Sequence, residues 1–158
     1  MVFRLCHLVI IFIIIESELA IETIQLSVPA RLSNLAGIRN FIRTALIPYC
    51  VDDDFLYQLA LTVEEAVTNI IMHGYHGRNG VITILIQPDD AEVEIVLQDD
   101  TPPFDPTSVP PPRLDLPLAK RPLGGLGVHL MRKHTDEMSY RRTPAGLNEL
   151  RLIKLYPS

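Results

Sequence analysis

Eight prolines fall within the 21 residues from Pro102 to Pro122. Proline lacks a backbone N–H and fixes φ, so this stretch can form neither a helix nor a central strand. A loop of this length inside a compact domain is usually a functional lid or a mobile segment. Residues 102–122, called the lid below, therefore divide the regular elements of the chain into two groups.

Composition favours one globular domain. The chain has 158 residues, 47% of them hydrophobic and 21% charged, which excludes a disordered or collagen-like protein. A net charge of -5 argues against a dedicated nucleic-acid binder, which normally carries a basic face. The two cysteines, Cys6 and Cys50, lie in no metal-ligand or redox spacing, so we expect a reduced, cytoplasmic compartment.

Residues 8–15 are an unbroken apolar run near the N-terminus. A helix needs about 20 apolar residues to span a bilayer, so the run gives no strong membrane signal. A signal peptide fits better, with Arg4 before the run, but residues 16–20 contain no small-residue cleavage site. We favour a third interpretation over a targeting role: residues 1–20 are an appendage or follow a start codon placed too early, and residues 21–158 form the domain.

Apolar periodicity predicts the elements on both sides of the lid. Before it come a strand at 23–28, a helix closed by Pro48, a second helix from Asp52 to Gly74, and a hairpin of strands at 81–86 and 91–98. After it come a helix opened by residues 124–127 and two strands near 138–142 and 149–155. This order predicts an α+β fold, a two-layer sandwich with helices on one face of a mixed, mostly antiparallel sheet.

Three polar residues of the second helix, Glu65, Asn69 and His73, recur every four positions. Each step of four advances only about 40° around a helix, so they form one stripe beside the apolar face. An amide oxygen such as that of Asn69 suits Mg²⁺, and Glu65 could take a proton from an attacking hydroxyl or water. Taken alone, however, the pattern fits a solvated helix edge better than a site.

Asp99 ends the strand at 91–98, on the side that Val93, Ile95 and Leu97 also face. A carboxylate on a core face is costly unless it has a partner. The amino group of an adenine, with a bridging water, would be one such partner. A backbone N–H at the start of a turn is the structural alternative, and the strand pattern does not decide between them.

Gly125, Leu126 and Gly127 open the helix that follows the lid. Glycines at a helix start let backbone N–H groups approach an anion, and the helix dipole favours negative charge there. Arg121, just upstream, is placed to reach a terminal phosphate. A glycine hinge at the end of the lid is an equally good explanation of this cluster in isolation.

The order of these features resembles a known family. Residues 63–69 (VEEAVTN), 99–106 (DDTPPFDP) and 121–127 (RPLGGLG) are similar to the N, G1 and G2 boxes of GHKL-type ATPases. More narrowly they resemble the anti-sigma regulatory factors, the RsbW/SpoIIAB-like serine kinases. The resemblance covers roughly residues 22–156 and includes the closing segments 136–138 and 146–150.

This resemblance implies a GHKL fold with an ATP lid, ATP and Mg²⁺ as cofactors, and a role for each matching residue. Glu65 resembles the general base, Asn69 the magnesium ligand and Asp99 the adenine-binding acid. The nucleotide would also contact His73, Thr101, Gly125, Leu126 and Gly127, with Arg121 at the γ-phosphate. The G1 box usually has glycine where this chain has Thr101, which adopts a positive φ only at a cost, so nucleotide affinity or lid geometry should differ.

The resemblance also implies an activity and partners. The leading hypothesis is an ATP-dependent serine/threonine-protein kinase that phosphorylates a STAS-type anti-anti-sigma protein and otherwise sequesters a sigma factor, with homodimerisation as a family tendency. The alternative is a nucleotide-gated binding module without turnover; Glu65 argues against it and Thr101 for it. A histidine-kinase fragment is weaker, because only His7 precedes His73 and no helix pair carries it.

Overall fold

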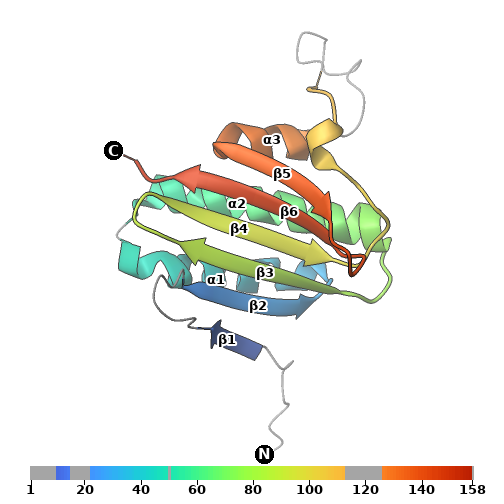
Figure 1. Cartoon of the computed structure of the whole chain (residues 1–158), viewed down its shortest axis with the longest axis horizontal. Coiled ribbons are helices and arrows are strands. Elements are labelled where there is room, and N and C mark those ends of the chain that lie inside the picture. The colour runs from blue at the N-terminus through green and yellow to red at the C-terminus, as the bar shows by residue number, and fades with distance from the viewer. Residues whose placement is uncertain (1–9, 15–21, 50, 113–125, 158) are drawn as a thin grey trace, which may run out of the picture.

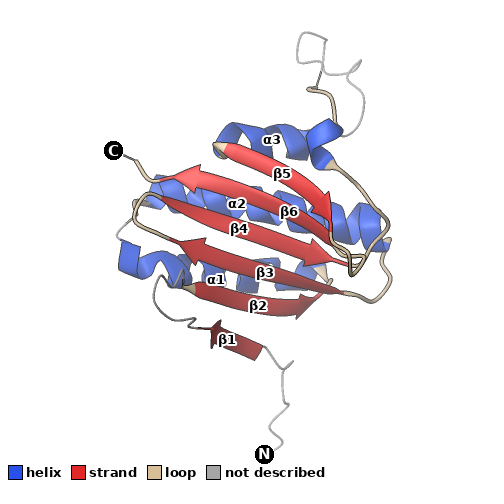
Figure 2. Ribbon diagram, in the orientation of Figure 1, coloured by secondary structure: helices blue, strands red, loops and turns tan. Residues whose placement is uncertain are grey.

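The computed structural model describes residues 10–14, 22–49, 51–112 and 126–157, which form two layers (Figure 1). One layer is a six-stranded sheet in the order β1-β2-β3-β4-β6-β5. Its strands are β1 (Ile10–Ile14), β2 (Thr23–Pro29), β3 (Val81–Pro88), β4 (Glu92–Asp99), β5 (Glu137–Arg142) and β6 (Asn148–Leu155). The other layer consists of helices α1 (Leu35–Leu46), α2 (Asp53–Asn69) and α3 (Leu126–His134), which cover one face of the sheet (Figure 2).

The predicted α+β sandwich is confirmed, and so is the mostly antiparallel sheet. Neighbouring strands in the described part of the chain are antiparallel throughout, so the expected parallel component is absent from it. The reason lies in the strand order. β4 and β5 run in the same direction, but β6 lies between them and pairs with both.

The N-terminal apolar run contributes a strand that the sequence patterns did not predict. β1 pairs with β2 at one edge of the sheet, with Ile10 opposite Ser27 and Ile14 opposite Thr23. The division into residues 1–20 and 21–158 stays a prediction, since residues 1–9 and 15–21 lie outside the described part. None of the helices in the described ranges is long and apolar enough to cross a membrane.

The core lies between the sheet and the helices, and the buried face of β4 continues as far as Asp99. Alternate residues of β3 and β4 are fully buried, namely Ile82, Ile84, Ile86, Val93, Ile95 and Leu97. The side chain of Asp52 caps α2 by accepting a hydrogen bond from the backbone N–H of Phe55 at 2.7 Å. Asp99 follows the buried positions of β4 in the same period and ends the strand on the core side.

The second predicted helix changes character before its end. α2 stops at Asn69, and a π-helix over Ile70–Tyr75 follows it until His76 turns to φ 52°. The prediction of a continuous α-helix to Gly74 was therefore wrong in the last turn. Ile71 and Tyr75 are buried at a spacing that suits either kind of helix, so apolar periodicity could not distinguish the two. Such π segments inside helices are frequent at functional sites.

The π-helix brings Gly74 directly against Thr101, which follows β4. A Cβ on Gly74 would lie 2.7 Å from Cγ2 and 2.8 Å from Oγ1 of Thr101, so there is no room for a side chain. His76 is the one non-glycine residue with a positive φ among the described residues, so Thr101 adopts an ordinary backbone conformation. The strain expected of a threonine at the G1 glycine position is thus absent, and its side chain instead fills the space beside Gly74.

Replacing Gly74 by alanine should lower the free energy of unfolding by about 1–3 kcal/mol, the usual cost of overpacking. Thr101→Gly should restore part of the loss in the double variant, because it removes the atoms that clash. Thermal or urea unfolding measures both effects. Gly37→Ala is the matched control: it lies in α1 with no atom within 4 Å of its Cβ, and should stabilise by about 0.5–1 kcal/mol. If the stability change of the double variant equalled the sum of the Gly74→Ala and Thr101→Gly changes, the contact between the two residues would be contradicted.

Two tyrosines, Tyr75 and Tyr156, provide a second test of the packing. Burial raises the pKa of each phenol to about 12. The single O–H of Tyr75 has two acceptors within hydrogen-bond distance, the Val81 carbonyl at 2.9 Å and Asp100 Oδ1 at 2.6 Å. The hydroxyl of Tyr156 is buried without a partner in the described structure. Tyr75→Phe should therefore cost about 1.5 kcal/mol, whereas Tyr156→Phe should be neutral or stabilising.

Urea unfolding at neutral pH measures both variants. Equal losses of unfolding free energy in Tyr75→Phe and Tyr156→Phe would contradict the hydrogen bonding described for the two hydroxyls.

The raised pKa values also predict how the stability of the protein depends on pH. The tyrosines contribute fully below their ordinary pKa of 10.0, and this stability is lost as the pH rises toward about 12.

Candidate functional site

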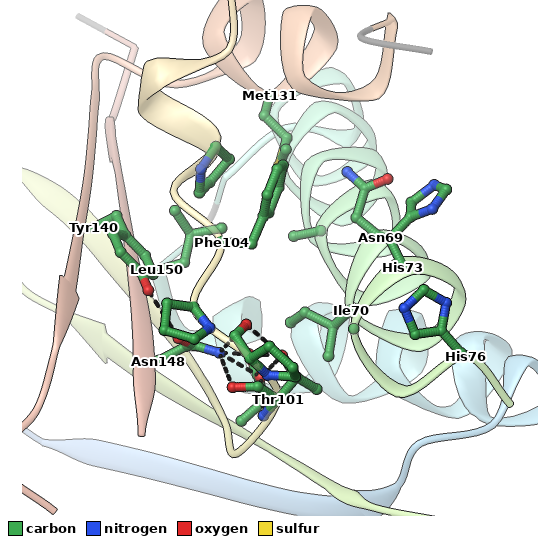
Figure 3. A pocket seen from close by; sticks show the side chains of 16 residues that line it. Asn69, Ile70, His73, His76, Thr101, Phe104, Met131, Tyr140, Asn148 and Leu150 are labelled. Atoms are coloured by element: carbon green, nitrogen blue, oxygen red, sulfur yellow. Dashed lines mark hydrogen bonds between the residues drawn. The ribbon is translucent and has the colours of Figure 1, made fainter. Parts of the chain in front are cut away.

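A cavity of about 250 Å³ opens at the end of β4, between the end of α2, the first residues of the lid and the hairpin of β5 and β6 (Figure 3). Its walls are largely apolar and include Ile70, Phe104, Met131 and Leu150. Its polar lining residues include Asn69, His73, Asp99, Thr101 and Asn148. The cavity thus combines apolar walls with a small number of polar groups, as small-molecule sites do.

Asp99 is 6% exposed, and its two carboxylate oxygens are in different situations. Oδ1 accepts hydrogen bonds from the backbone N–H of Thr101 at 2.9 Å, from Thr101 Oγ1, and from Nδ2 of Asn148 at 2.8 Å. The described residues donate no hydrogen bond to Oδ2. The predicted backbone cap is therefore present, yet it satisfies only one oxygen and leaves the other available to a donor in the cavity.

Asn69 and His73 lie on the wall formed by α2 and the π-helix, and Figure 3 shows them next to each other. Tyr140 and Asn148 lie across the cavity, on the hairpin side. Two of the three residues in the predicted helix stripe therefore line the cavity that Asp99 also lines. The change to a π-helix after Asn69 does not remove His73 from this wall.

Glu65 does not line the cavity but lies just beyond Asn69, against the first turn of α3. A Cβ on Gly127 would lie 2.6 Å from Oε2 of Glu65 and 3.6 Å from Nδ2 of Asn69. This close approach is possible because Gly127 has no side chain. The structure thus brings Glu65, Asn69 and Gly127 together, and Leu126, the first residue of α3, is 56% exposed beside them.

The lid begins with a fixed segment. Pro106–Ser108 form a 3₁₀ turn, and Nη2 of Arg132 on α3 donates to the Pro106 carbonyl at 3.3 Å and the Thr107 carbonyl at 2.8 Å. Arg132 therefore ties the start of the lid to α3. Residues 113–122 of the lid, with Arg121, and also Gly125 lie outside the described residues, so the predictions for these two stay untested.

Sequence reasoning missed the neighbours that hold Asp99, above all Asn148. The segment 146–150 was noted only as part of the family resemblance. A usable signal was present, because alternation along β6 puts Asn148 on the same face as the buried Leu150 and Leu152. What the alternation could not supply is the pairing of Asn148 with Asp99, which depends on the register of β4 and β6.

The described residues contain no group of three or more histidine, cysteine or acidic side chains that could hold a metal ion. Mg²⁺ bound with a nucleotide does not require such a group, because phosphates and waters fill most of its coordination sites. Asn69 lines the cavity and its Nδ2 lies toward Gly127, and its amide oxygen is a ligand of the kind that Mg²⁺ prefers. The polar groups present therefore fit a nucleotide-bound magnesium ion.

Known proteins are similar to this chain over most of its length. A model of the histidine kinase-like ATPase domain matches residues 28–154. Serine-protein kinase RsbW of Bacillus cereus (strain G9842) is 28% identical over 121 residues, 74% of this chain and 76% of the relative. Serine/threonine-protein kinase BtrW of Bordetella bronchiseptica is 32% identical over 97 residues, 61% of this chain and 68% of the relative.

A solved structure of similar shape supports the same fold. It is the crystal structure of the RsbU and RsbW domains of a Mycobacterium tuberculosis protein, with a TM-score of 0.54 at 16% sequence identity. The match covers 85% of this chain but only 33% of the solved chain, so this chain spans about a third of the chain in that crystal structure. The chain therefore belongs to the histidine kinase-like ATPase domain family, among its RsbW-like members.

Proposed function

We propose that this chain is an ATP- and magnesium-dependent serine/threonine-protein kinase that phosphorylates a STAS-type anti-anti-sigma protein and otherwise sequesters a sigma factor. One arrangement carries the proposal: Asp99 offers an open carboxylate oxygen in the cavity, and Asn69 connects that cavity to Glu65 and the first turn of α3. The first part suits a purine base, and the second suits phosphates and a reacting hydroxyl.

The cavity supports binding of the adenine base. At about 250 Å³ it is smaller than the roughly 300–1,000 Å³ of pockets that enclose a whole ligand, so it fits the base while the rest of the nucleotide extends outward. Ile70, Met131 and Leu150 offer apolar surface for the ring. Oδ2 of Asp99 would accept a hydrogen bond from the exocyclic amino group of adenine.

The other end of the site supports binding of phosphate. α3 begins beside Glu65 and Asn69, and its first backbone N–H groups and its dipole favour an anion. Gly125 and Gly127 would let the phosphates approach the backbone, and Arg121 would contact the γ-phosphate. Asn69 would hold Mg²⁺, which offsets the developing phosphate charge when it is bound.

Glu65 would then act as the general base. The described residues donate no hydrogen bond to its carboxylate, so it is free to accept the proton of a serine hydroxyl. As that proton leaves, the serine oxygen forms a bond to the γ-phosphorus and the bond from the γ-phosphorus to the bridging oxygen breaks. The products are phosphoserine on the partner and ADP.

The relatives support the activity more strongly than they support the partners. Their names, serine-protein kinase RsbW and serine/threonine-protein kinase BtrW, describe kinases, which supports kinase activity here at low identity. The STAS-type acceptor, the sigma factor, a homodimer and a cytoplasmic location are parts of the proposal. They rest on the family resemblance and on the cysteine content.

Transfer of labelled γ-phosphate from ATP to a STAS-type partner tests the activity. Glu65→Gln should reduce the transfer rate by at least about 100-fold while leaving nucleotide binding intact, because only proton acceptance is lost. Glu64→Gln is the matched control. It alters the neighbouring residue, whose carboxylate pairs with Arg39 on α1 at 2.8 Å, and should leave the rate nearly unchanged.

Wild-type protein that binds the nucleotide but transfers no phosphate to any STAS-type partner would remove the kinase claim. That result would favour the nucleotide-gated binding module, for which Thr101 at the G1 glycine position is the supporting feature. Equal loss of transfer in Glu65→Gln and Glu64→Gln would contradict the role of Glu65 alone.

Magnesium-dependent ATP binding, measured by calorimetry, tests the base site separately. Asp99→Asn should weaken binding about tenfold or more, since it replaces the charged acceptor at Oδ2 and introduces a donor. Asp100→Asn is the control, because its carboxylate accepts from Tyr75 and lines a different cavity. Equal affinity in wild type and Asp99→Asn would show that the base does not bind at Asp99.

A further inference from the structure

Asn148 is the residue that orients Asp99, and its own amide is completely satisfied. Asn148 is 5% exposed, and Nδ2 donates to Oδ1 of Asp99 at 2.8 Å and to the Thr101 carbonyl at 3.0 Å. Oδ1 of Asn148 accepts from the Tyr140 hydroxyl at 2.8 Å and from Nη1 of Arg142 at 2.8 Å. An asparagine amide has two donors and two acceptor sites, so all four are used.

The chemistry of the partners fixes which way this amide points. Arg142 can only donate, so the atom it contacts must be the amide oxygen. The Thr101 carbonyl can only accept, so the atom it contacts must be the amide nitrogen. The orientation of Asn148 therefore follows from its neighbours, and it forces an N–H rather than an oxygen toward Asp99.

Strand register places these groups in one row across the sheet. Asp99 on β4 is the direct partner of Asn148 on β6, and Asn148 is in turn the direct partner of Arg142 on β5. Tyr140 lies two residues before Arg142 on the same side of its strand. The hairpin of β5 and β6 therefore supplies both Asn148 and the two side chains that donate to its amide oxygen.

We propose that Asn148, oriented by Tyr140 and Arg142, sets the base preference of the nucleotide site by holding the carboxylate of Asp99 so that Oδ2 is the acceptor that meets the base. Among the described residues, Asn148 and Thr101 supply every hydrogen bond that Oδ1 of Asp99 accepts, and these bonds hold the carboxylate with Oδ2 as the oxygen left for the ligand. An acceptor selects a base edge that carries an amino group, as adenine does, and repels the O6 carbonyl of guanine. The proposal deepens the proposed function and rests on it.

Asn148 is a positioning residue in this scheme, because it acts on the ligand through Asp99. A purely structural role would predict a different result when its neighbours are changed. Without Tyr140 and Arg142, Oδ1 of Asn148 is left buried and loses both of its donors, so the amide holds Asp99 less firmly. The effect should appear in the choice between ATP and GTP, whereas loosened packing would weaken both alike.

The experiment compares the affinities of non-hydrolysable ATP and GTP analogues, with magnesium, by calorimetry. The double variant Tyr140→Phe/Arg142→Met should lower the ratio of ATP to GTP affinity about tenfold, close to the value of one well-placed base contact. Tyr140→Phe alone, which removes a single hydroxyl, should lower the ratio by a smaller factor. Restoring a donor with Arg142→Lys in place of Met should recover most of the preference.

Two matched controls isolate the effect. Arg141→Met changes the neighbouring arginine, which pairs with Glu149 outside the cavity, and Tyr57→Phe changes a tyrosine that is 64% exposed. Neither should alter the affinity ratio. If the double variant fails to fold, Tyr140→Phe carries the test, and its thermal unfolding should remain close to that of the wild type.

The outcomes separate this inference from the proposed function. Wild-type protein that binds neither analogue overturns both. Wild-type protein that prefers ATP, combined with variants that keep the same preference or lose both affinities equally, overturns the role of Asn148 and leaves the proposed function standing. A fall in the ratio of ATP to GTP affinity that is confined to the Tyr140 and Arg142 variants supports the role of Asn148.

Discussion

The burial of one carboxylate determines how this site is organised. Asp99 continues the core face of β4, where an ionised group is costly unless donors surround it. Two segments supply those donors: the turn after β4, through Thr101, and the start of β6, through Asn148. Because the described residues donate only to Oδ1, Oδ2 is the oxygen that we propose binds the base. The same hydrogen bonds thus offset the cost of burying the carboxylate and, in the proposed function, hold it in place for the base.

This arrangement links the two layers of the fold. The sheet provides Asp99 and Asn148, while α2 and its π-helical end provide the facing wall with Asn69 and His73. Gly74 on the π-helix packs on Thr101, so the helix layer holds the same turn that binds Asp99. The threonine that departs from the G1 pattern of the family is therefore built into both layers, and its backbone needs no unusual φ.

Local patterns predicted much of this structure. Alternation in β4 put Val93, Ile95 and Leu97 on one face together with Asp99, and all four are buried. Helical spacing placed Asn69 and His73 on one wall. It failed at the last turn of α2, because the buried Ile71 and Tyr75 fit an α-helix and a π-helix equally well.

Non-local pairing set the limit of prediction. The hydrogen bond from Asn148 to Asp99 spans 49 positions and exists only because β6 pairs with β4 in one register. The contact of Gly74 with Thr101 depends in the same way on how the layers meet. β1 was not predicted because its apolar run carries no alternation that indicates a partner. The roles of Arg121 and Gly125 lie beyond the described residues.

The central claim is that the cavity at the end of β4 receives a nucleotide base whose amino group bonds to Oδ2 of Asp99. A crystal structure with a non-hydrolysable ATP analogue and magnesium tests it most directly. The account predicts the exocyclic nitrogen of adenine within hydrogen-bond distance of Asp99 Oδ2 and the phosphates at the first turn of α3. A base bound elsewhere on the protein, with the cavity filled only by water, would contradict it.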